Sequence, residues 1–209
     1  MNILPPSSQA LDQALTILQK GGIVAHATET CYGFACDLTN PEAVQRLFAI
    51  KKRPSEQPVS ALFPSIEEAK KYVEWNDRAE ELAKKHLPGP LTLILPLRSD
   101  APMPIFPSLL STSNFPLSTS LGIRVSSHPL AQSLVERFGK PLSTTSANPH
   151  GQPNPYSAEE ISKQFRGENL QPDLILDSGP LSPTPPSTVI DMTPGSERKT
   201  MRQGVISNE

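Results

Sequence analysis

The chain has 209 residues, a formal net charge of −2 and a sequence pI of about 6.1, and hydrophobic residues make up 36% of it. The near-neutral charge excludes a polybasic nucleic-acid binder over the whole chain, although a local basic patch stays open. The length predicts a single domain over residues 1–209, with enough apolar residues for a sizeable core.

The first half of the chain alternates predicted helices and strands. Apolar spacing predicts an amphipathic helix over 8–20, and Asn40, with a proline after it, begins a helix that runs to about Lys51. Capping residues predict two more helices, which begin at Ser65 and Asn76. Strands are expected over 23–25, 58–63 and 91–95.

The second half continues this alternation after a proline- and serine-rich loop that is expected over 98–119. A helix is expected over 128–138 with Gly139 at its end, and another after Ser157. Strands are expected over 121–125, 173–177 and 187–191, and from Pro141 onwards. The alternation predicts an α/β (α+β) fold with a mixed sheet that helices cover.

The stretch 141–148 begins like a strand and ends in small polar side chains. Its short hydrogen-bond donors, none of them charged, are Ser143, Thr144, Thr145, Ser146 and Asn148. With help from backbone amides, such a run can wrap a polyanionic or polyhydroxyl ligand. The alternative is an ordinary polar loop after a strand.

Four cations stand out by their positions. Lys51 and Arg53 follow the end of a predicted helix, where cations favour the helix dipole without binding a ligand. A phosphate clamp is the functional alternative at this point. Arg124 lies between apolar neighbours in a predicted strand, and Arg202 is isolated near the end of the chain. Each of these two arginines faces either solvent or a site.

The sequence lacks the motifs of several common kinds of binding and active sites. It has no glycine-rich phosphate loop, dinucleotide fingerprint or nucleophile elbow. Cys31 and Cys36 are too few for a disulfide framework, and the four histidines lack metal-ligand spacing, so no metal site is expected. The start of the chain has no secretory pattern and no apolar run approaches the ~20 residues of a membrane span, so we expect a cytoplasmic protein without membrane contact.

Taken in order, the motifs resemble those of the YrdC-type threonylcarbamoyl-AMP synthases over nearly the whole chain. The pairs Lys51-x-Arg53 and Ser146-x-Asn148 match the hallmark of that family. The other matching segments are 22–25, 28–33, 88–92, 122–125, 187–191 and 202–204. Each motif is weak alone, but the ordered set is specific.

The resemblance implies a YrdC-like twisted mixed sheet surrounded by helices, with a concave and positively lined cavity. It implies an L-threonylcarbamoyladenylate synthase, a nucleotidyltransferase that converts L-threonine, bicarbonate and ATP into threonylcarbamoyl-AMP and pyrophosphate. Mg²⁺ would bridge the phosphates of ATP. The product would serve the threonylcarbamoyladenosine modification of tRNA, so tRNA threonylcarbamoyltransferase proteins are expected downstream, and direct contact with tRNA stays open.

The same resemblance implies roles for individual residues. Lys51 and Arg53 are the expected catalytic residues, with Lys51 neutralising phosphate or carbamate charge. Thr144 and Ser146 are expected to face threonine and ATP, respectively, across one turn. ATP binding is expected from Lys51, Arg53, Ser120, Ser146, Asn148, Asn154 and Arg202, with Asn148 shaping the Ser146 loop. Threonine binding is expected from Thr30, Arg124, Thr144 and Ser187, with Arg124 as the partner of the carboxylate.

The sequence departs from the family pattern at a few points. Gln57 stands where many relatives have Asn or Lys, and Leu62 stands where one branch has a histidine near threonine. Because the chain ends soon after residues 202–204, we expect no second C-terminal domain of the kind found in the longer branch.

Three other interpretations compete with the synthase. The main one is an RNA-binding YrdC-like module without nucleotidyl transfer, against which the 5% aromatic content and the acidic pI count. A carbamoyl-transferring relative would carry acylphosphatase and zinc-finger segments, which this sequence lacks. An inactive paralogue is disfavoured by the intact Lys-x-Arg and Ser-x-Asn pairs.

Overall fold

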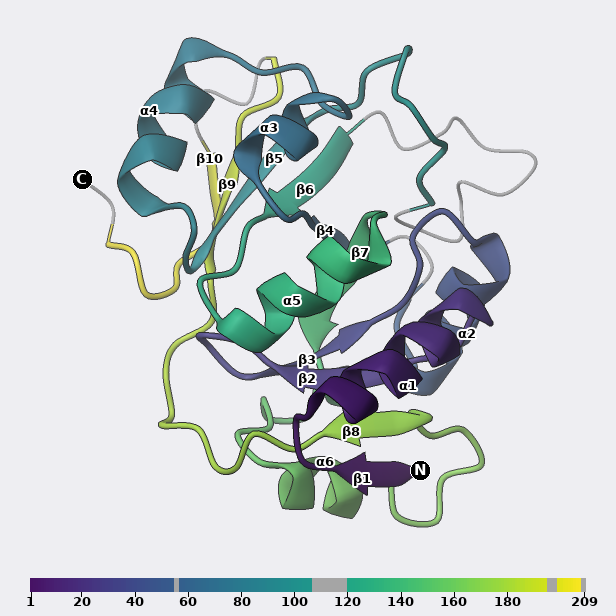
Figure 1. Cartoon of the computed structure of the whole chain (residues 1–209). Coiled ribbons are helices and arrows are strands. Elements are labelled where there is room, and N and C mark those ends of the chain that lie inside the picture. The colour runs from purple at the N-terminus through teal and green to yellow at the C-terminus, as the bar shows by residue number, and fades with distance from the viewer. Residues whose placement is uncertain (55–56, 107–119, 195–198, 208–209) are drawn as a thin grey trace.

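The computed structural model describes residues 1–54, 57–106, 120–194 and 199–207 (Figure 1). From residue 107 onwards, the expected loop 98–119 lies outside the described residues. The strands are β1 Asn2–Leu4, β2 Val24–Ala27, β3 Tyr32–Ala35, β4 Ser60–Leu62, β5 Leu91–Pro96, β6 Ser120–Arg124, β7 Leu142–Ser146, β8 Leu174–Leu176, β9 Thr188–Asp191 and β10 Lys199–Arg202. The helices are α1 Ser8–Gln19, α2 Pro41–Lys51, α3 Ile66–Lys70, α4 Asp77–His86, α5 Pro129–Phe138 and α6 Ala158–Gln164. No helix within these ranges is long and apolar enough to cross a membrane.

The described strands form one mixed sheet in the order β1-β8-β2-β3-β7-β4-β6-β5-β9-β10. The pairs β1–β8, β2–β8, β4–β6 and β5–β9 are parallel, and the other neighbours run antiparallel. Since β1 and β10 form the two edges of the sheet, these two strands lie far apart on the molecule (Figure 1). The mixed α/β fold predicted from the alternation of elements is confirmed.

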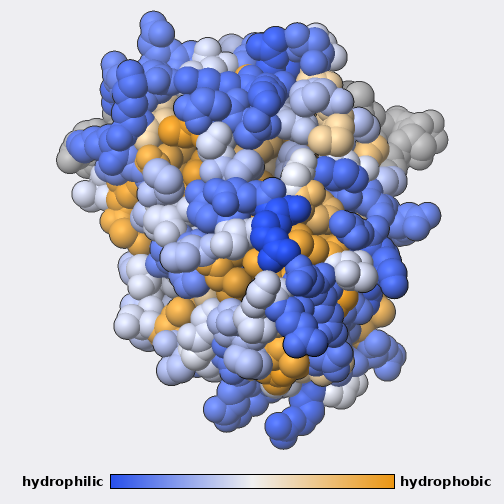
Figure 2. All heavy atoms as spheres, viewed as in Figure 1, coloured by the Kyte–Doolittle hydropathy of each residue, from blue (hydrophilic) through white to orange (hydrophobic). Residues whose placement is uncertain are grey.

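Alternating side chains of the inner strands feed two hydrophobic clusters, one on each face of the sheet. In β2, Val24 packs into one cluster and Ala25 into the other, and Leu174 and Ile175 of β8 divide in the same way. Helices α1 and α5 cover the first face, while α2, α3, α4 and α6 contribute to the second cluster (Figure 1). Hydrophilic residues predominate on the outer side of the α1 and α5 layer, with hydrophobic ones in small groups between them (Figure 2).

Capping side chains set the helix starts that the sequence predicts. Ser7 Oγ accepts a hydrogen bond from Ala10 N at 3.1 Å, and Asn40 Oδ1 accepts one from Glu42 N at 3.0 Å. The same role at α3, α4 and α6 belongs to Ser65, Asn76 and Ser157. Gly139 ends α5 with a φ of 73°, a left-handed conformation that costs glycine little because it has no Cβ.

Three strands, β1, β3 and β10, were not predicted from the sequence. β1 and β10 are edge strands of three and four residues, too short to show an alternating pattern. All four residues of β3 are buried, so this strand has no alternation of polar and apolar side chains either. Because β3 pairs antiparallel with β2, the polar residues 28–31 form the turn of a hairpin. This turn brings Thr28, Glu29 and Thr30 to the site described next.

Candidate active site

A cavity of about 260 Å³ is lined by residues of the β2–β3 turn and of β4, β5, β6, β7, β9 and β10. Along β6, Ser120, Gly122 and Arg124 line its wall, while Leu121 and Ile123 between them lie in the core. This is the alternation that a strand imposes on neighbouring side chains. The strand therefore delivers an arginine to the cavity from a segment that is otherwise apolar.

Most of the site residues expected from the sequence line this cavity. They are Thr30, Arg53, Ser120, Arg124, Thr144, Ser146, Asn154, Ser187 and Arg202. Lys51 and Asn148 are buried and are not among the lining residues. The structure thus brings the expected residues together around one space, and their individual roles stay predictions.

The charges on the cavity wall are of one sign. Among the described lining residues are Arg53, Arg124 and Arg202, and none of the lining residues is an aspartate or glutamate. Burial, followed by the charge of Arg202, lowers the pKa of Arg53, and burial followed by the charge of Arg124 lowers the pKa of Arg202. Guanidinium groups nevertheless stay protonated at neutral pH. A concave surface with this charge pattern favours an anionic ligand.

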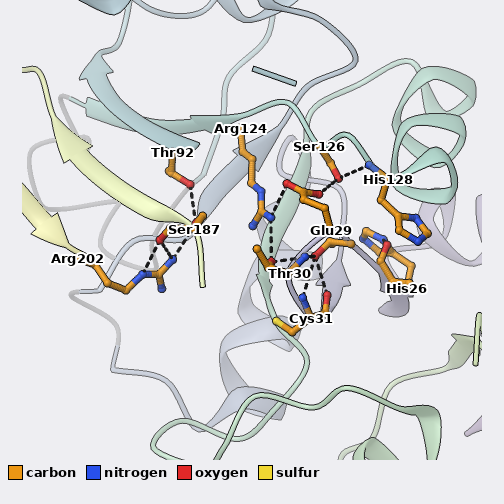
Figure 3. Close-up of polar contacts among 12 residues, drawn as sticks. His26, Glu29, Thr30, Cys31, Thr92, Arg124, Ser126, His128, Ser187 and Arg202 are labelled. Carbon is orange, nitrogen blue, oxygen red and sulfur yellow. Dashed lines mark hydrogen bonds and ion pairs between the residues drawn. The ribbon is translucent and has the colours of Figure 1, made fainter. Parts of the chain in front are cut away.

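Arg124 is held at the β2–β3 turn (Figure 3). Its Nη2 donates to Glu29 Oε1 at 2.8 Å and to Thr30 Oγ1 at 3.0 Å. Its Nε is buried and has no acceptor in the part of the chain that the structure describes. A buried donor without an acceptor is costly.

Arg202 holds Ser187 on the opposite side of the cavity (Figure 3). Its Nε and Nη2 donate to the Ser187 carbonyl oxygen at 3.0 and 2.9 Å, and Nη2 also donates to Ser187 Oγ at 2.8 Å. Thr92 Oγ1 lies 3.1 Å from the same hydroxyl. These contacts fix the Ser187 hydroxyl on the wall between two strands.

Thr144 and Ser146 both lie on strand β7, so the expected turn between them is wrong, while the assignment of threonine to one and ATP to the other stays a prediction. Residues two apart on a strand point to the same side, which is why both line the cavity. The strand expected from Pro141 onwards thus continues as a straight piece of the cavity wall up to Ser146. The chain turns away from the strand only after that residue.

Lys51 lies behind this part of the cavity wall and stabilises it through hydrogen bonds. Its Nζ donates to the carbonyl oxygens of Ser146 and Asn148, the second at 2.8 Å, and to Asn148 Oδ1 at 3.2 Å. Ser146 Oγ donates to the same Asn148 Oδ1 at 2.6 Å. Burial, together with the charge of Arg53, lowers the pKa of Lys51 to about 7. The two hallmark pairs of the sequence are therefore joined by hydrogen bonds through one ammonium group.

His26 is a buried titratable group next to the Arg124 cluster (Figure 3). Its Nδ1 lies 3.0 Å from the carbonyl oxygen of Ala27, and its Nε2 has no partner among the described residues. Burial lowers the pKa of His26 to about 4, and the nearby charges of His128 and Arg124 act in the same direction. The imidazole is therefore neutral in the folded protein at neutral pH.

This neutral histidine predicts a loss of stability on acidification. Between pH 6.5 and 4 the unfolded chain takes up a proton that folded His26 does not bind, so stability falls as pH falls, by about 3 kcal/mol in total. Urea unfolding at several pH values should show a shallower pH dependence for His26→Asn than for the wild type. His150→Asn, on an exposed loop, is the control. Equal slopes for His26→Asn and the wild type contradict the prediction.

Sequence reasoning missed three residues that organise the site. Glu29 and Ser126 hold Arg124 from behind, and Thr92 contacts Ser187. Glu29 was visible as a lone carboxylate between two threonines directly after a buried strand. Its partner, however, is 95 positions away in the chain. Only the pairing of the strands brings the two together.

Comparison with known proteins identifies the family. The Sua5/YciO/YrdC family model, described as "Telomere recombination", matches residues 16–204. A threonylcarbamoyl-AMP synthase of Photobacterium profundum is 35% identical over 173 residues, which cover 81% of this chain and 88% of the relative. Escherichia coli YciO has a similar structure, with a TM-score of 0.80 and 28% identity over 99% of this chain and 95% of YciO. Pyrococcus abyssi Sua5 complexed with L-threonine matches with a TM-score of 0.77 and 31% identity over 91% of this chain and 53% of Sua5. The chain belongs to the Sua5/YciO/YrdC family.

Proposed function

We propose that this chain is an L-threonylcarbamoyladenylate synthase, a nucleotidyltransferase that makes threonylcarbamoyl-AMP and pyrophosphate from L-threonine, bicarbonate and ATP. The observation that carries the proposal is the cavity, whose described lining residues include three arginines, several hydroxyl groups and no carboxylate. Both substrates that would bind there are anionic at one end. The name of the relative from Photobacterium profundum supports the same activity.

Threonine would bind at the Arg124 end of the cavity. Arg124 lines the cavity, and its guanidinium suits the substrate carboxylate. Thr30 and Thr144 offer hydroxyl groups on the cavity wall, and Ser187 offers one from the opposite side of the cavity. The complex of Pyrococcus abyssi Sua5 with L-threonine supports a threonine site in a fold of this kind.

ATP would bind along the Arg53, Ser146 and Arg202 side of the cavity, with Ser120 and Asn154 as further contacts. The forked guanidinium of Arg53 suits phosphate oxygens, because it can donate two parallel hydrogen bonds. Lys51 and Asn148 would act from behind by holding Ser146. The predicted contact of Lys51 with phosphate or carbamate would require that its ammonium leave those carbonyl oxygens.

The reaction would need electrostatic stabilisation more than a covalent nucleophile. The threonine nitrogen forms a bond to the carbon of bicarbonate with loss of water, which gives a carbamate. A carbamate oxygen then attacks the α-phosphorus of ATP, and the bond between that phosphorus and the bridging oxygen breaks. Pyrophosphate leaves with the electron pair. Charge builds on phosphate oxygens in this step, where positioned guanidinium groups stabilise it.

Mg²⁺ is expected to accompany ATP. In the described part of the chain, no group of three or more His, Cys, Asp or Glu side chains could hold a metal ion. The described cavity lining has no carboxylate, so the phosphates of the nucleotide would be the main ligands of the ion, and no proposed step depends on it. The product is an activated acyl adenylate, which we propose is consumed by a tRNA threonylcarbamoyltransferase.

Pyrophosphate release is the direct test of this proposal. A coupled pyrophosphate assay with the wild-type chain should give turnover only when ATP, L-threonine and bicarbonate are all present. Turnover that is unchanged when threonine is omitted contradicts the substrate assignment. If there is no turnover but tight, salt-sensitive RNA binding, the RNA-binding module is the correct interpretation.

A further inference from the structure

Glu29 pairs with Arg124 from behind the cavity wall. The carboxylate accepts from Arg124 Nη2 at 2.8 Å, and the two side chains are only 14% and 9% exposed, respectively. Arg124 lines the cavity and Glu29 does not. The carboxylate is therefore placed to hold the arginine, not to meet a ligand in the cavity.

A second layer holds Glu29 in turn (Figure 3). Ser126 is fully buried; its hydroxyl donates to Glu29 Oε2 and accepts from His128 N at 3.2 Å. Because an ionised carboxylate can only accept, the Ser126 hydroxyl proton is directed at Glu29, while the His128 N–H donates to a lone pair of Ser126 Oγ. His128 caps helix α5, so the start of a packed helix anchors this chain of hydrogen bonds.

The charge of Glu29 is secured by the same contacts. Burial acts most strongly and would raise its pKa, but the charge of Arg124 and the hydrogen bonds from Ser126 and Arg124 outweigh it and lower the pKa. The carboxylate is thus ionised at neutral pH. An ionised acceptor gives a strong, well-directed hydrogen bond to a guanidinium.

The arrangement leaves part of Arg124 for a ligand. Both contacts to Glu29 and Thr30 use Nη2, while the side chain of Arg124 still lines the cavity. An arginine side chain has many rotamers, and the entropy lost when one is fixed weakens binding unless the protein has fixed it beforehand. The carboxylate of a bound amino acid would meet a guanidinium whose direction is already set.

We infer that Glu29 and Ser126 are positioning residues that fix the Arg124 guanidinium for the carboxylate of the amino-acid substrate. The inference rests on the proposed function, since it concerns the threonine end of the same cavity. According to this inference, Glu29 affects the binding of threonine and not the binding of ATP. The nucleotide would bind near Arg53, whose own hydrogen bonds go to the carbonyl oxygens of Gln57 and Pro58 and not to Glu29.

The test separates the two substrates in steady-state kinetics. Glu29→Ala should raise the KM for threonine about tenfold while the KM for ATP changes less than about twofold. Glu29→Gln can still accept from Arg124 and donate to Ser126, so it should restore most of the threonine KM. Ser126→Ala should raise the threonine KM to a smaller extent. Adding Ser126→Ala to Glu29→Ala should have no further effect, because Ser126 acts through Glu29.

Glu159→Ala is the matched control, since Glu159 forms an ion pair with Lys163 and is 76% exposed on α6. An unchanged or lower threonine KM in Glu29→Ala overturns the inference, and so does an equal rise for both substrates. A Glu29→Gln variant as defective as Glu29→Ala overturns it too, because orientation would then not be the role. If Glu29→Ala does not fold, Ser126→Ala and Glu29→Gln carry the test. Failure of the proposed function is distinguishable, because the wild type itself would then show no threonine-dependent pyrophosphate release.

Discussion

Replacing Arg53 by alanine is expected to lower threonine-dependent pyrophosphate release about 1,000-fold, the loss typical of removing an arginine that stabilises a phosphoryl-transfer transition state. The guanidinium lines the cavity, and the described lining residues provide no carboxylate to neutralise it. Among the described residues, its hydrogen bonds to the fold go to the carbonyl oxygens of Gln57 and Pro58, both at 2.8 Å. The melting temperature should therefore change by no more than about 3 °C.

Two variants make this expectation specific. Arg53→Lys keeps the charge but loses the forked donor, so it should recover only part of the activity. Arg78→Ala removes an exposed arginine that pairs with Glu81 on α4 and should leave the activity unchanged. An Arg53→Ala variant that keeps its turnover, or one that loses turnover only because it unfolds, would remove Arg53 from the catalytic residues.

Arg124→Ala should behave differently from Arg53→Ala for a physical reason. Removing Arg124 leaves the carboxylate of Glu29 buried without its counter-charge. A buried charge that loses its partner typically costs about 3–5 kcal/mol. Stability and turnover should therefore be measured for both variants. Arg53→Ala should lose turnover alone, whereas Arg124→Ala should lose stability as well.

Local features of the sequence predicted most of the fold. Helix starts followed from single capping residues such as Asn40 and Ser157, whose side chains accept from backbone N–H groups within three positions. The central strands followed from short apolar runs such as 91–95. Both signals are contained in a few neighbouring residues, so a single sequence can carry them.

Features that depend on distant partners could not be predicted in this way. Strand β3 is buried along its whole length and is recognisable only through its pairing with β2 and β7. The pairing of Arg124 with Glu29 joins β6 to the β2–β3 turn. The edge strands β1 and β10 have only three and four residues and exist because β8 and β9 offer free edges. All of these contacts depend on the register between strands, and no single segment of the sequence determines that register.

The position of Lys51 shows the same limit at the site itself. The resemblance grouped Lys51 with Arg53 as residues that meet the ligand, because together they match the Lys-x-Arg motif of the family. Helix α2 ends at Lys51, and the chain then leaves the helix through a left-handed residue, Lys52, with a φ of 50°. That change of direction sends Lys51 into the interior and Arg53 to the cavity wall. The two residues of the motif therefore occupy different places in the structure, and their roles stay predictions.

Replacing Lys51 by methionine is accordingly expected to damage the fold and the activity together. The variant keeps the length of the side chain but leaves the carbonyl oxygens of Ser146 and Asn148 without their buried donor. Buried polar groups that lose a charged partner cost about 3 kcal/mol, which for a chain of this size lowers the melting temperature by about 6–12 °C. Turnover should fall at least about 100-fold because the wall that carries Ser146 shifts.

Lys52→Met is the matched control for this variant. It makes the same chemical change one residue further on, where the side chain is 61% exposed and pairs with Glu168. Its effect on stability should stay within about 0.5 kcal/mol, with turnover unchanged. Thermal unfolding and pyrophosphate release measured on both variants give the comparison. If Lys51→Met were as stable as Lys52→Met and still inactive, Lys51 would act on the ligand directly, as the resemblance implied, and not through the wall that it holds.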